Sequence, residues 1–177
     1  MENIEVLKQE QGGLYPKEIG VELRPLRAED AGEVLRIASR ERVARYMRFE
    51  TLHTLEEAEK LVEEYRKGVA WAVLEGEKGI FRGICALKPP ENPEDEGRYS
   101  MSMFLDEAVC SRGIASKLVS WDIEYAKNTL RCPGLLAYVV DRNLGSRRTL
   151  EKNGFRIERE LHFADMEGCL LVFGIRF

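Results

Sequence analysis

The stretch Cys110–Leu118, which reads Cys-Ser-Arg-Gly-Ile-Ala-Ser-Lys-Leu, decides how the rest of the chain is interpreted. It follows a strand-like run, Tyr99–Leu105, and precedes a helical pattern that reaches about Leu130. A strand, a turn of small residues and a helix present free backbone N–H groups at the helix start, where the helix dipole also favours an anion. Gly113 and Ala115 leave this backbone open to a phosphate. The alternative is a helix start built only for capping and tight packing.

The composition is that of an ordinary globular protein. The 177 residues are 44% apolar and 33% charged, and a chain of this length forms one domain with a substantial core. A net charge of -4 gives no electrostatic reason to expect binding to nucleic acid or to a membrane surface. No apolar run approaches the length of a membrane span, and the N-terminus is too polar for a secretory signal. We therefore expect a cytoplasmic protein with neither nucleic acid nor membrane among its partners.

The cysteines and histidines are too scattered to predict a metal site. The cysteines show no close pair and no metal-ligand spacing, and only two histidines are available to join them. Scattered cysteines of this kind fit a reducing cytosol, where they act as small apolar residues. The residues are Cys85, Cys110, Cys132, Cys169, His53 and His162.

Hydrophobic patterns predict a single α/β domain over residues 20–177. Alternating apolar residues at 70–87 and at 155–177 indicate two antiparallel hairpins. The continuous apolar run Leu135–Val140 is typical of a parallel strand covered on both faces. A helix separates it from Tyr99–Leu105, which indicates a right-handed crossover. The predicted sheet is therefore mixed and mostly antiparallel, with flanking helices.

Local signals place two helix boundaries within that domain. Thr54 and Glu57 form a capping box, so a helix is predicted to begin there. A short helix over Leu144–Lys152 is predicted to end at the Asn-Gly pair that follows it. Residues 1–19 are polar and without clear periodicity, and the sequence leaves open whether they form a tail or an extra strand.

Three motifs taken together resemble the Gcn5-related N-acetyltransferase (GNAT) superfamily. The resemblance runs from about Gly20 to Phe177, and it rests on the order and spacing of the motifs. The segments Val43–Met47 and Thr54–Ala58 are similar to the RimJ/RimL-like branch, which acetylates the N-termini of ribosomal proteins. The motifs are Arg112-Gly113-x-Ala115-x-x-Leu118, Asn143-x-x-Ser146 and Glu151-Lys152-x-Gly154-Phe155.

The resemblance implies a central pair of parallel strands that splay apart and admit acetyl-CoA, the co-substrate, between them. These strands would be Tyr99–Leu105 and Leu135–Asp141. The pantetheine arm would pair with backbone near Phe104 and Leu105 and accept a hydrogen bond from Asn143. Its pyrophosphate would bind backbone N–H groups of the turn, which agrees with the physical interpretation of that turn. The turn residues are Arg112, Gly113, Ile114, Ala115 and Ser116.

The implied activity is direct transfer of an acetyl group to a primary amine, in a monomer or a homodimer. The amine would be the α-amino group of a protein or peptide. One alternative is an acetyltransferase for a small molecule such as a polyamine or an aminoglycoside, which the acidic loop Glu91–Glu96 would favour if it faced the acceptor. Another is a CoA-binding protein without transfer activity, which Leu150 and Ser100 support because they replace expected catalytic side chains.

The sequence departs from the family pattern at three positions. Two of these departures concern the cofactor turn and the catalytic acid. Cys110 stands where the loop usually opens with Gln or Arg. We expect only a modest loss of cofactor affinity, because the loop binds the cofactor mainly through backbone donors. Leu150 stands where many relatives carry a tyrosine that protonates the departing thiolate. Ser146, one turn earlier, is the candidate for that role, and a helix-start hydrogen bond to nearby backbone is the alternative.

A third departure concerns the general base. Ser100 stands where many relatives carry a glutamate, which leaves Glu158, Asp165 or water to take the proton. A lysine amine, with a pKa near 10.4, is neutral in about one molecule in 2,500 at pH 7, whereas an α-amino group near 7.8 is roughly 14% neutral. A site without an evident base therefore favours an α-amine acceptor.

Overall fold

The computed structural model describes residues 20–47, 49–164 and 167–177, so the expectation for residues 1–19 lies outside the described part. The strands are β1 (Glu22–Pro25), β2 (Val69–Glu75), β3 (Ile80–Lys88), β4 (Tyr99–Leu105), β5 (Gly134–Val140), β6 (Arg156–Leu161) and β7 (Leu170–Arg176). The α-helices are α2 (Ala31–Ala38), α3 (Glu41–Ala44), α4 (Leu55–Arg66), α5 (Ile114–Tyr125) and α6 (Leu144–Lys152).

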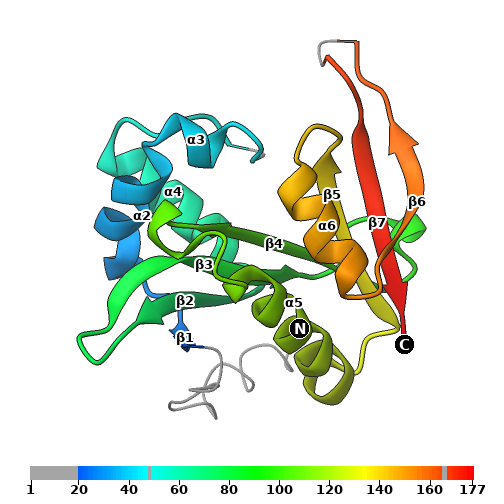
Figure 1. Cartoon of the computed structure of the whole chain (residues 1–177), viewed down its shortest axis with the longest axis horizontal. Helices are drawn as coiled ribbons and strands as arrows, with labels where there is room; N and C mark the ends of the chain where they lie inside the picture. Colours follow the sequence, from blue (N-terminus) through cyan, green and yellow to red (C-terminus); the bar gives the residue numbers. More distant parts are fainter. Residues whose placement is uncertain (1–19, 48, 165–166) are drawn as a thin grey trace. The chain divides into compact units, whose positions relative to one another are not determined.

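The seven described strands form one mixed sheet in the order β1-β2-β3-β4-β5-β7-β6 (Figure 1). Strands β4 and β5 are parallel, whereas β1–β2, β2–β3, β5–β7 and β6–β7 are antiparallel. The predicted α/β class, with a mostly antiparallel sheet and flanking helices, is therefore confirmed.

The parallel pairing of β4 and β5 is short. It covers three residue pairs, from Tyr99–Leu135 to Met101–Ala137, although each strand has seven residues. Pairing confined to the start of two strands is what the predicted splayed pair requires. The chain divides into two compact units, residues 1–88 with 103–114 and residues 89–102 with 115–177, so β4 contributes to both.

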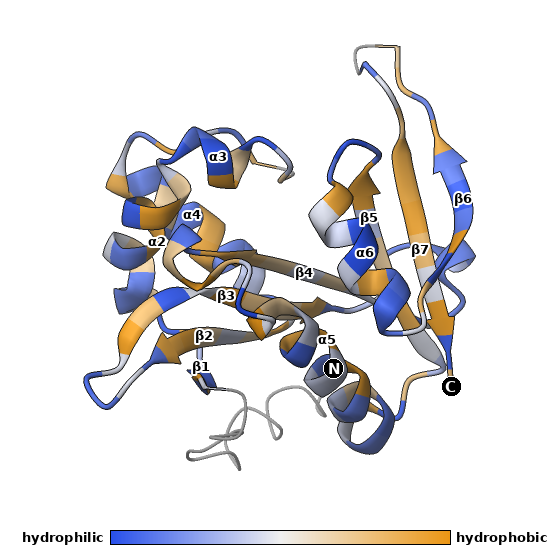
Figure 2. Ribbon diagram, viewed as in Figure 1, coloured by the Kyte–Doolittle hydropathy of each residue, from blue (hydrophilic) through white to orange (hydrophobic). Residues whose placement is uncertain are grey.

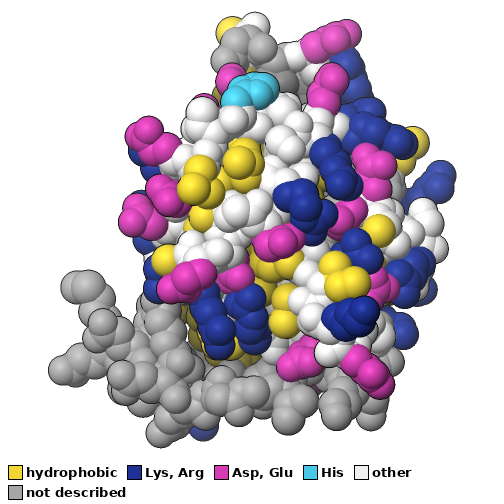
Figure 3. Space-filling model, turned by 90° about the vertical axis from the view of Figure 1, so that its left-hand side faces the viewer, with side chains coloured by type: hydrophobic (Ala, Val, Ile, Leu, Met, Phe, Trp, Pro, Cys, Tyr) yellow, Lys and Arg dark blue, Asp and Glu magenta, His cyan; other side chains and the backbone are white. Residues whose placement is uncertain are grey.

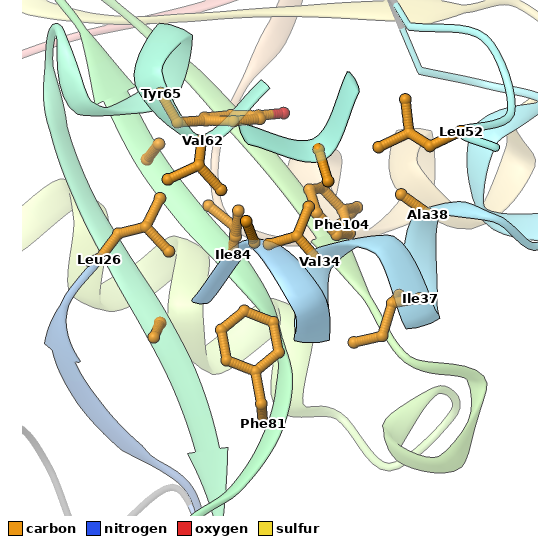
Figure 4. Close-up of a cluster of buried hydrophobic side chains, with 14 residues drawn as sticks. Leu26, Val34, Ile37, Ala38, Leu52, Val62, Tyr65, Phe81, Ile84 and Phe104 are labelled. Atoms are coloured by element: carbon orange, nitrogen blue, oxygen red, sulfur yellow. The ribbon is translucent and has the colours of Figure 1, made fainter. Parts of the chain in front are cut away.

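The first unit packs helices α2 and α4 over its strands. Thr54 and Glu57 form the predicted capping box at the start of α4: Glu57 N–H donates to Thr54 Oγ1 at 3.2 Å, and Thr54 N–H donates to Glu57 Oε2 at 2.9 Å. Lys60 and Glu56 form an exposed ion pair on α4, at 2.7 Å. Figure 3 shows basic and acidic side chains interspersed over one face of the protein. Figure 4 shows the buried cluster between the helices and the strands, which includes Leu26, Val34, Ile37, Ala38, Leu52, Val62, Tyr65, Phe81, Ile84 and Phe104.

The second unit places β7 between β5 and β6, and β7 is mostly apolar whereas β6 is mostly polar (Figure 2). Helix α5 continues into a π-helical segment, Ala126–Leu130, which confirms the predicted extent of this helix. Helix α6 has the predicted bounds and its C-cap is Asn153, the first residue of the Asn-Gly pair. Local sequence signals therefore determine the ends of the helix that follows β5.

Candidate active site

The residues predicted to bind acetyl-CoA fall into both units, and each group is described within its own unit. The first unit holds Phe104, Leu105, Arg112, Gly113 and Ile114. The second holds Ala115, Ser116, Asn143 and the predicted acid Ser146.

The turn before α5 has the backbone conformation that its glycine suggests. Gly113 has a φ of 76°, in the left-handed region, and a Cβ placed there would meet no atom within 4 Å. Ser111, Arg112 and Gly113 are all exposed. A left-handed turn with open space above its glycine is compatible with close approach of an anion to the backbone. The turn therefore fits a phosphate group.

The side chain of Arg112 is anchored to strand β2. Its guanidinium forms an ion pair with Glu75, the last residue of β2, and Nη1 also donates to the carbonyl of Ala108 at 3.4 Å. Hydrogen bonds from Arg112 and then from Arg82 lower the pKa of the Glu75 carboxyl below its ordinary value. The Arg112 side chain therefore helps to fix the turn, and its backbone remains the part suited to a phosphate.

Directly after β4, Asp106 is buried at the centre of an ion-pair cluster that sequence reasoning missed. Its carboxylate accepts hydrogen bonds from Arg36 Nη1 at 3.0 Å, Arg40 Nη1 at 3.0 Å, Arg82 Nη1 at 3.4 Å and the backbone N–H of Ala108 at 3.2 Å. Burial alone would raise the pKa of Asp106, but the Ala108 N–H and the arginines lower it below its ordinary value. Arg36 and Arg40 lie four residues apart in the sequence, but only Arg36 belongs to α2, and Arg40 is the extended N-cap residue of α3, so no helix-face pattern indicated the cluster.

Asp106 also affects the pKa of the Cys110 thiol. Burial, followed by the carboxylates of Glu107 and Asp106, raises the pKa of the Cys110 thiol, and Arg42 acts in the opposite direction. A raised pKa disfavours the nucleophilic thiolate. Cys110 is thus poorly suited to covalent catalysis.

Strand β4 ends in the core of the first unit. Phe104 is 4% exposed, and its ring lies 5.5 Å from that of Phe49 and 6.1 Å from that of Tyr65. Figure 4 shows Phe104 and Tyr65 in the same buried cluster. Leu105 is half-buried. Met47 and Phe49 pack against this cluster. The side chains around Phe104 hold the end of β4 in place, so the backbone there has a fixed position.

In the second unit, Ser116 and Asn143 make contacts that bind the helices together. Asn153, the C-cap of α6, donates through Nδ2 to Ser116 Oγ at 2.9 Å, which joins α5 to α6. Ala115 lies beside Ser116 and is half-buried. Asn143 is the N-cap of α6, and its Oδ1 accepts from the Ser146 N–H at 3.1 Å. This cap leaves the amide nitrogen of Asn143 as its donor for a ligand.

Ser146 is half-buried in the first turn of α6. Its hydroxyl makes no hydrogen bond to any residue in the described part of the chain. The alternative interpretation, a helix-start bond from its hydroxyl to nearby backbone, is therefore absent there, because Asn143 caps the helix instead. The hydroxyl remains available to a ligand.

Of the two carboxylates proposed as bases, one is described. Glu158 accepts hydrogen bonds from Arg98 Nη1 through both carboxylate oxygens, at 2.8 Å each, and the Arg98 side chain is only 3% exposed. Asp165 lies outside the described residues. Ser100 and Leu150 carry no base or acid, and Leu150 is 2% exposed in the core. Both carboxylate oxygens of Glu158 are therefore engaged by a guanidinium that is itself buried.

Comparison with known proteins identifies the family. The model of the acetyltransferase (GNAT) domain matches residues 21–156, so the chain belongs to this family. Probable N-acetyltransferase YjcK of Bacillus subtilis (strain 168) is 29% identical over 77% of this chain and 80% of its own length. The protein is thus an N-acetyltransferase that depends on acetyl-CoA.

Solved structures agree in fold. An acetyltransferase of the GNAT family from Bacillus anthracis has a TM-score of 0.76 at 18% identity, covering 88% of this chain and 94% of that one. Spermidine N-acetyltransferase from Vibrio cholerae, in complex with CoA and spermine, has a TM-score of 0.74 at 16% identity, covering 89% and 95%. In the described part of the chain no helix is long and apolar enough to cross a membrane. Nor do the described His, Cys, Asp and Glu side chains form a metal-ligating group of three or more.

Proposed function

We propose that this acetyltransferase modifies the α-amino group of a protein or peptide, as the RimJ/RimL-like branch does. The observation that carries the proposal is the engagement of Glu158 by Arg98, at 2.8 Å through both carboxylate oxygens. Ser100 stands at the position where many relatives carry the base, and Glu158, the described substitute, is held by Arg98. An acceptor that is already partly neutral at pH 7 needs the least help, and an α-amine has an advantage of about 3.5 kcal/mol over a lysine amine in this respect.

Acetyl-CoA would bind through the backbone of the turn and of β4, and it supplies an activated acetyl thioester. Its pyrophosphate would accept hydrogen bonds from the turn, and the Asn143 amide would donate to the pantetheine arm. The backbone near Leu105 would stabilise the charge that develops on the carbonyl oxygen. The turn residues are Arg112, Gly113, Ile114, Ala115 and Ser116, and the strand residues are Phe104 and Leu105.

In the proposed reaction the neutral amine attacks the thioester carbonyl, a C–N bond forms and the C–S bond breaks. The amine proton passes to water, and Ser146 donates a proton to the departing thiolate. A thiol with a pKa near 8.5 leaves readily, so this help is modest. The available hydroxyl of Ser146 supports that assignment.

A small-molecule amine is the second candidate acceptor, because the Vibrio cholerae neighbour is a spermidine N-acetyltransferase. The acidic loop that would attract a polyamine is already engaged within the second unit. Glu94 pairs with Arg159 at 2.7 Å, and Glu96 forms an ion pair with Arg176. These pairs reduce the negative charge offered to a polyamine, which favours the α-amine proposal.

We further propose a single acetyltransferase domain over residues 20–177, located in the cytoplasm as a monomer or homodimer. The family match to residues 21–156 supports the domain, and the scattered cysteines support a reducing compartment.

Thiol release from acetyl-CoA tests the function when the full chain is offered an alanyl peptide, spermidine and an aminoglycoside, with CoA binding followed by calorimetry. We expect turnover with the peptide to be the fastest. Tight CoA binding without turnover of any amine would contradict the transfer activity, and turnover of spermidine alone would contradict the α-amine proposal.

Gly113 offers a matched pair of variants for the turn. Gly113→Asp should abolish CoA binding, because it places a negative charge beside the phosphates. Gly113→Ala should bind CoA, because a Cβ there meets nothing within 4 Å. An alanine in the left-handed backbone conformation should lower the free energy of unfolding by about 1–2 kcal/mol. Normal CoA binding by Gly113→Asp would show that the turn is not the phosphate site.

A further inference from the structure

A carboxylate at the end of β5 has a buried oxygen without a partner. Asp141 follows the last residue of this strand, and its Oδ1 is inaccessible to solvent and makes no hydrogen bond in the described part of the chain. Buried polar atoms in native proteins nearly always have a partner, and an unpaired buried carboxylate oxygen costs more than a neutral group would. A hydrogen-bond donor, from a ligand or from water, would stabilise this oxygen.

The backbone on both sides of this carboxylate is fixed. The Asp141 N–H donates to the Cys169 carbonyl at 3.0 Å, which joins the end of β5 to the start of β7 (Figure 1). The Asp141 carbonyl accepts from Arg147 Nη1 at 3.0 Å. Arg147 therefore binds the main chain of Asp141, and Arg142 pairs with Glu167 at 3.0 Å. Among the described residues, the contact of Arg147 is with the Asp141 carbonyl and not with its carboxylate.

Gly168 leaves the space that this carboxylate occupies. A Cβ on Gly168 would lie 2.7 Å from Asp141 Oδ1 and 2.8 Å from Oδ2. Gly168 also has a φ of 94°, a conformation that other residues rarely adopt. Both oxygens therefore face the backbone just before β7, in the connection between β6 and β7.

The negative charge of the Asp141 carboxylate affects the neighbouring Cys169 thiol. Burial, followed by the carboxylates of Asp141 and Glu160, raises the pKa of the Cys169 thiol, while Arg147 acts in the opposite direction. The same segment of chain carries Asn143 and Ser146, and Asn143 N–H donates to the Val140 carbonyl at 2.8 Å. A negatively charged site with an unpaired acceptor favours a cation that carries hydrogen-bond donors. This site lies close in the chain to the residues assigned to the transfer reaction.

We propose that the Asp141 carboxylate binds the ammonium form of the acceptor amine on arrival, before the amine loses its proton to water and attacks in its neutral form. The inference rests on the proposed transfer to an amine and names the residue that recognises the acceptor. An ammonium has three N–H donors and one positive charge, so it satisfies the orphan oxygen and its charge together. The acetylated product is a neutral amide and loses this ion pair. Asp141 thus discriminates the substrate from the product and acts on acceptor affinity.

The test is calorimetric titration of amines into the full chain saturated with CoA, which permits binding without transfer. The amine probes are an alanyl tripeptide amide, Nα-acetyl-lysine amide and spermidine, and the N-acetylated tripeptide amide is the neutral probe. The Asp141→Asn variant keeps the shape of the side chain and removes its charge. Glu160→Gln is the matched control, because it removes a carboxylate that also acts on Cys169 but is 58% exposed.

We expect wild type to bind at least one amine probe and to ignore the neutral probe. Asp141→Asn should bind that amine about 10- to 100-fold more weakly, with unchanged CoA affinity, and Glu160→Gln should resemble wild type. Equal affinity in wild type and Asp141→Asn, an equal loss in Glu160→Gln, or no amine binding by wild type would each overturn the inference. Failure of wild type to bind CoA would instead contradict the proposed function, and titration of the free protein would then decide the role of Asp141.

Discussion

The two carboxylates that follow β4 and β5 stand in opposite environments. Asp106, after β4, accepts hydrogen bonds from three arginines and a backbone N–H. Asp141, after β5, has a buried oxygen without a partner in the described residues. Each residue comes directly after its strand, so sequence position alone does not distinguish them. One carboxylate holds its own unit together, whereas the other is the one for which we propose a ligand.

The physical reason lies in the cost of a buried charge. A carboxylate that is removed from water needs donors, and Asp106 receives them from α2, from β3 and from the turn after β4. Among the described residues, Cys169 and Arg147 hold Asp141 through its main chain. Function is commonly placed where local stability has not been maximised. The comparison therefore predicts that changes at Asp106 affect folding, and that changes at Asp141 affect binding.

The largest expected effect is that of Asp106→Ala on stability. The variant leaves three guanidinium groups without their shared partner, and we expect the free energy of unfolding to fall by about 2–4 kcal/mol. The free energy of unfolding should fall less in Asp106→Asn, because the amide oxygen of the asparagine still accepts a hydrogen bond from the Ala108 N–H. Urea denaturation measures both, and a loss below about 0.5 kcal/mol in Asp106→Ala would contradict the structural role.

Acid should remove the contribution of Asp106 progressively. Its pKa is lowered in the folded protein, so its stabilisation is complete above the unfolded value of about 3.9 and is lost as the pH falls through the lower folded value. The difference in unfolding free energy between wild type and Asp106→Asn should therefore be constant above about pH 5 and shrink below pH 4. Other carboxylates with lowered pKa values, such as Asp30, cancel in this difference. A difference that does not change with pH would contradict the ion-pair account.

On the β5 side, Ser146→Ala should act on turnover alone. Because Asn143 caps α6, the Ser146 hydroxyl is not needed for the helix start, and stability should change by less than about 0.5 kcal/mol. The kcat should fall by about 10-fold, since a thiolate leaves with little acid help. CoA affinity should be unchanged. Steady-state kinetics with the best acceptor measure this, and an unaltered kcat would remove Ser146 from the mechanism.

The smallest expected effect is that of Asp141→Asn on stability. The change removes a charge from a buried oxygen that lacks a partner, so the free energy of unfolding should stay within about 0.5 kcal/mol of wild type or rise. Denaturation by urea alongside Asp106→Asn gives a direct contrast. A larger loss in Asp141→Asn than in Asp106→Asn would reverse the comparison on which these predictions depend.

The elements could be predicted from the sequence because their signals are local. The bounds of β4 and α6 and the capping box of α4 agree with the structure, and each depends on residues a few positions apart. The mixed sheet follows from the same patterns together with the short connections. Helix-start and turn chemistry are properties of neighbouring residues, and the sequence contains them in full.

The electrostatic character of individual carboxylates could not be predicted in this way. Asp106 meets Arg36 and Arg40 across 70 and 66 residues, and Glu158 meets Arg98 across 60. A sequence pattern does not contain such pairings. The sequence therefore predicts Glu158 as a candidate base and gives no indication of the ion pairs of Asp106. Asn143 was assigned to the cofactor by resemblance, and its capping of α6 depends on a side-chain rotamer. The cofactor and catalytic assignments of the nine site residues remain predictions.

The most direct test of the proposed activity uses one peptide that carries both an α-amine at an alanyl N-terminus and a single lysine. The full chain is incubated with acetyl-CoA at pH 7, and mass spectrometry locates the first acetyl group. Because an α-amine is neutral several hundred times more often than a lysine amine, we predict acetylation at the N-terminus. First acetylation on the lysine side chain would contradict an enzyme that works without its own general base.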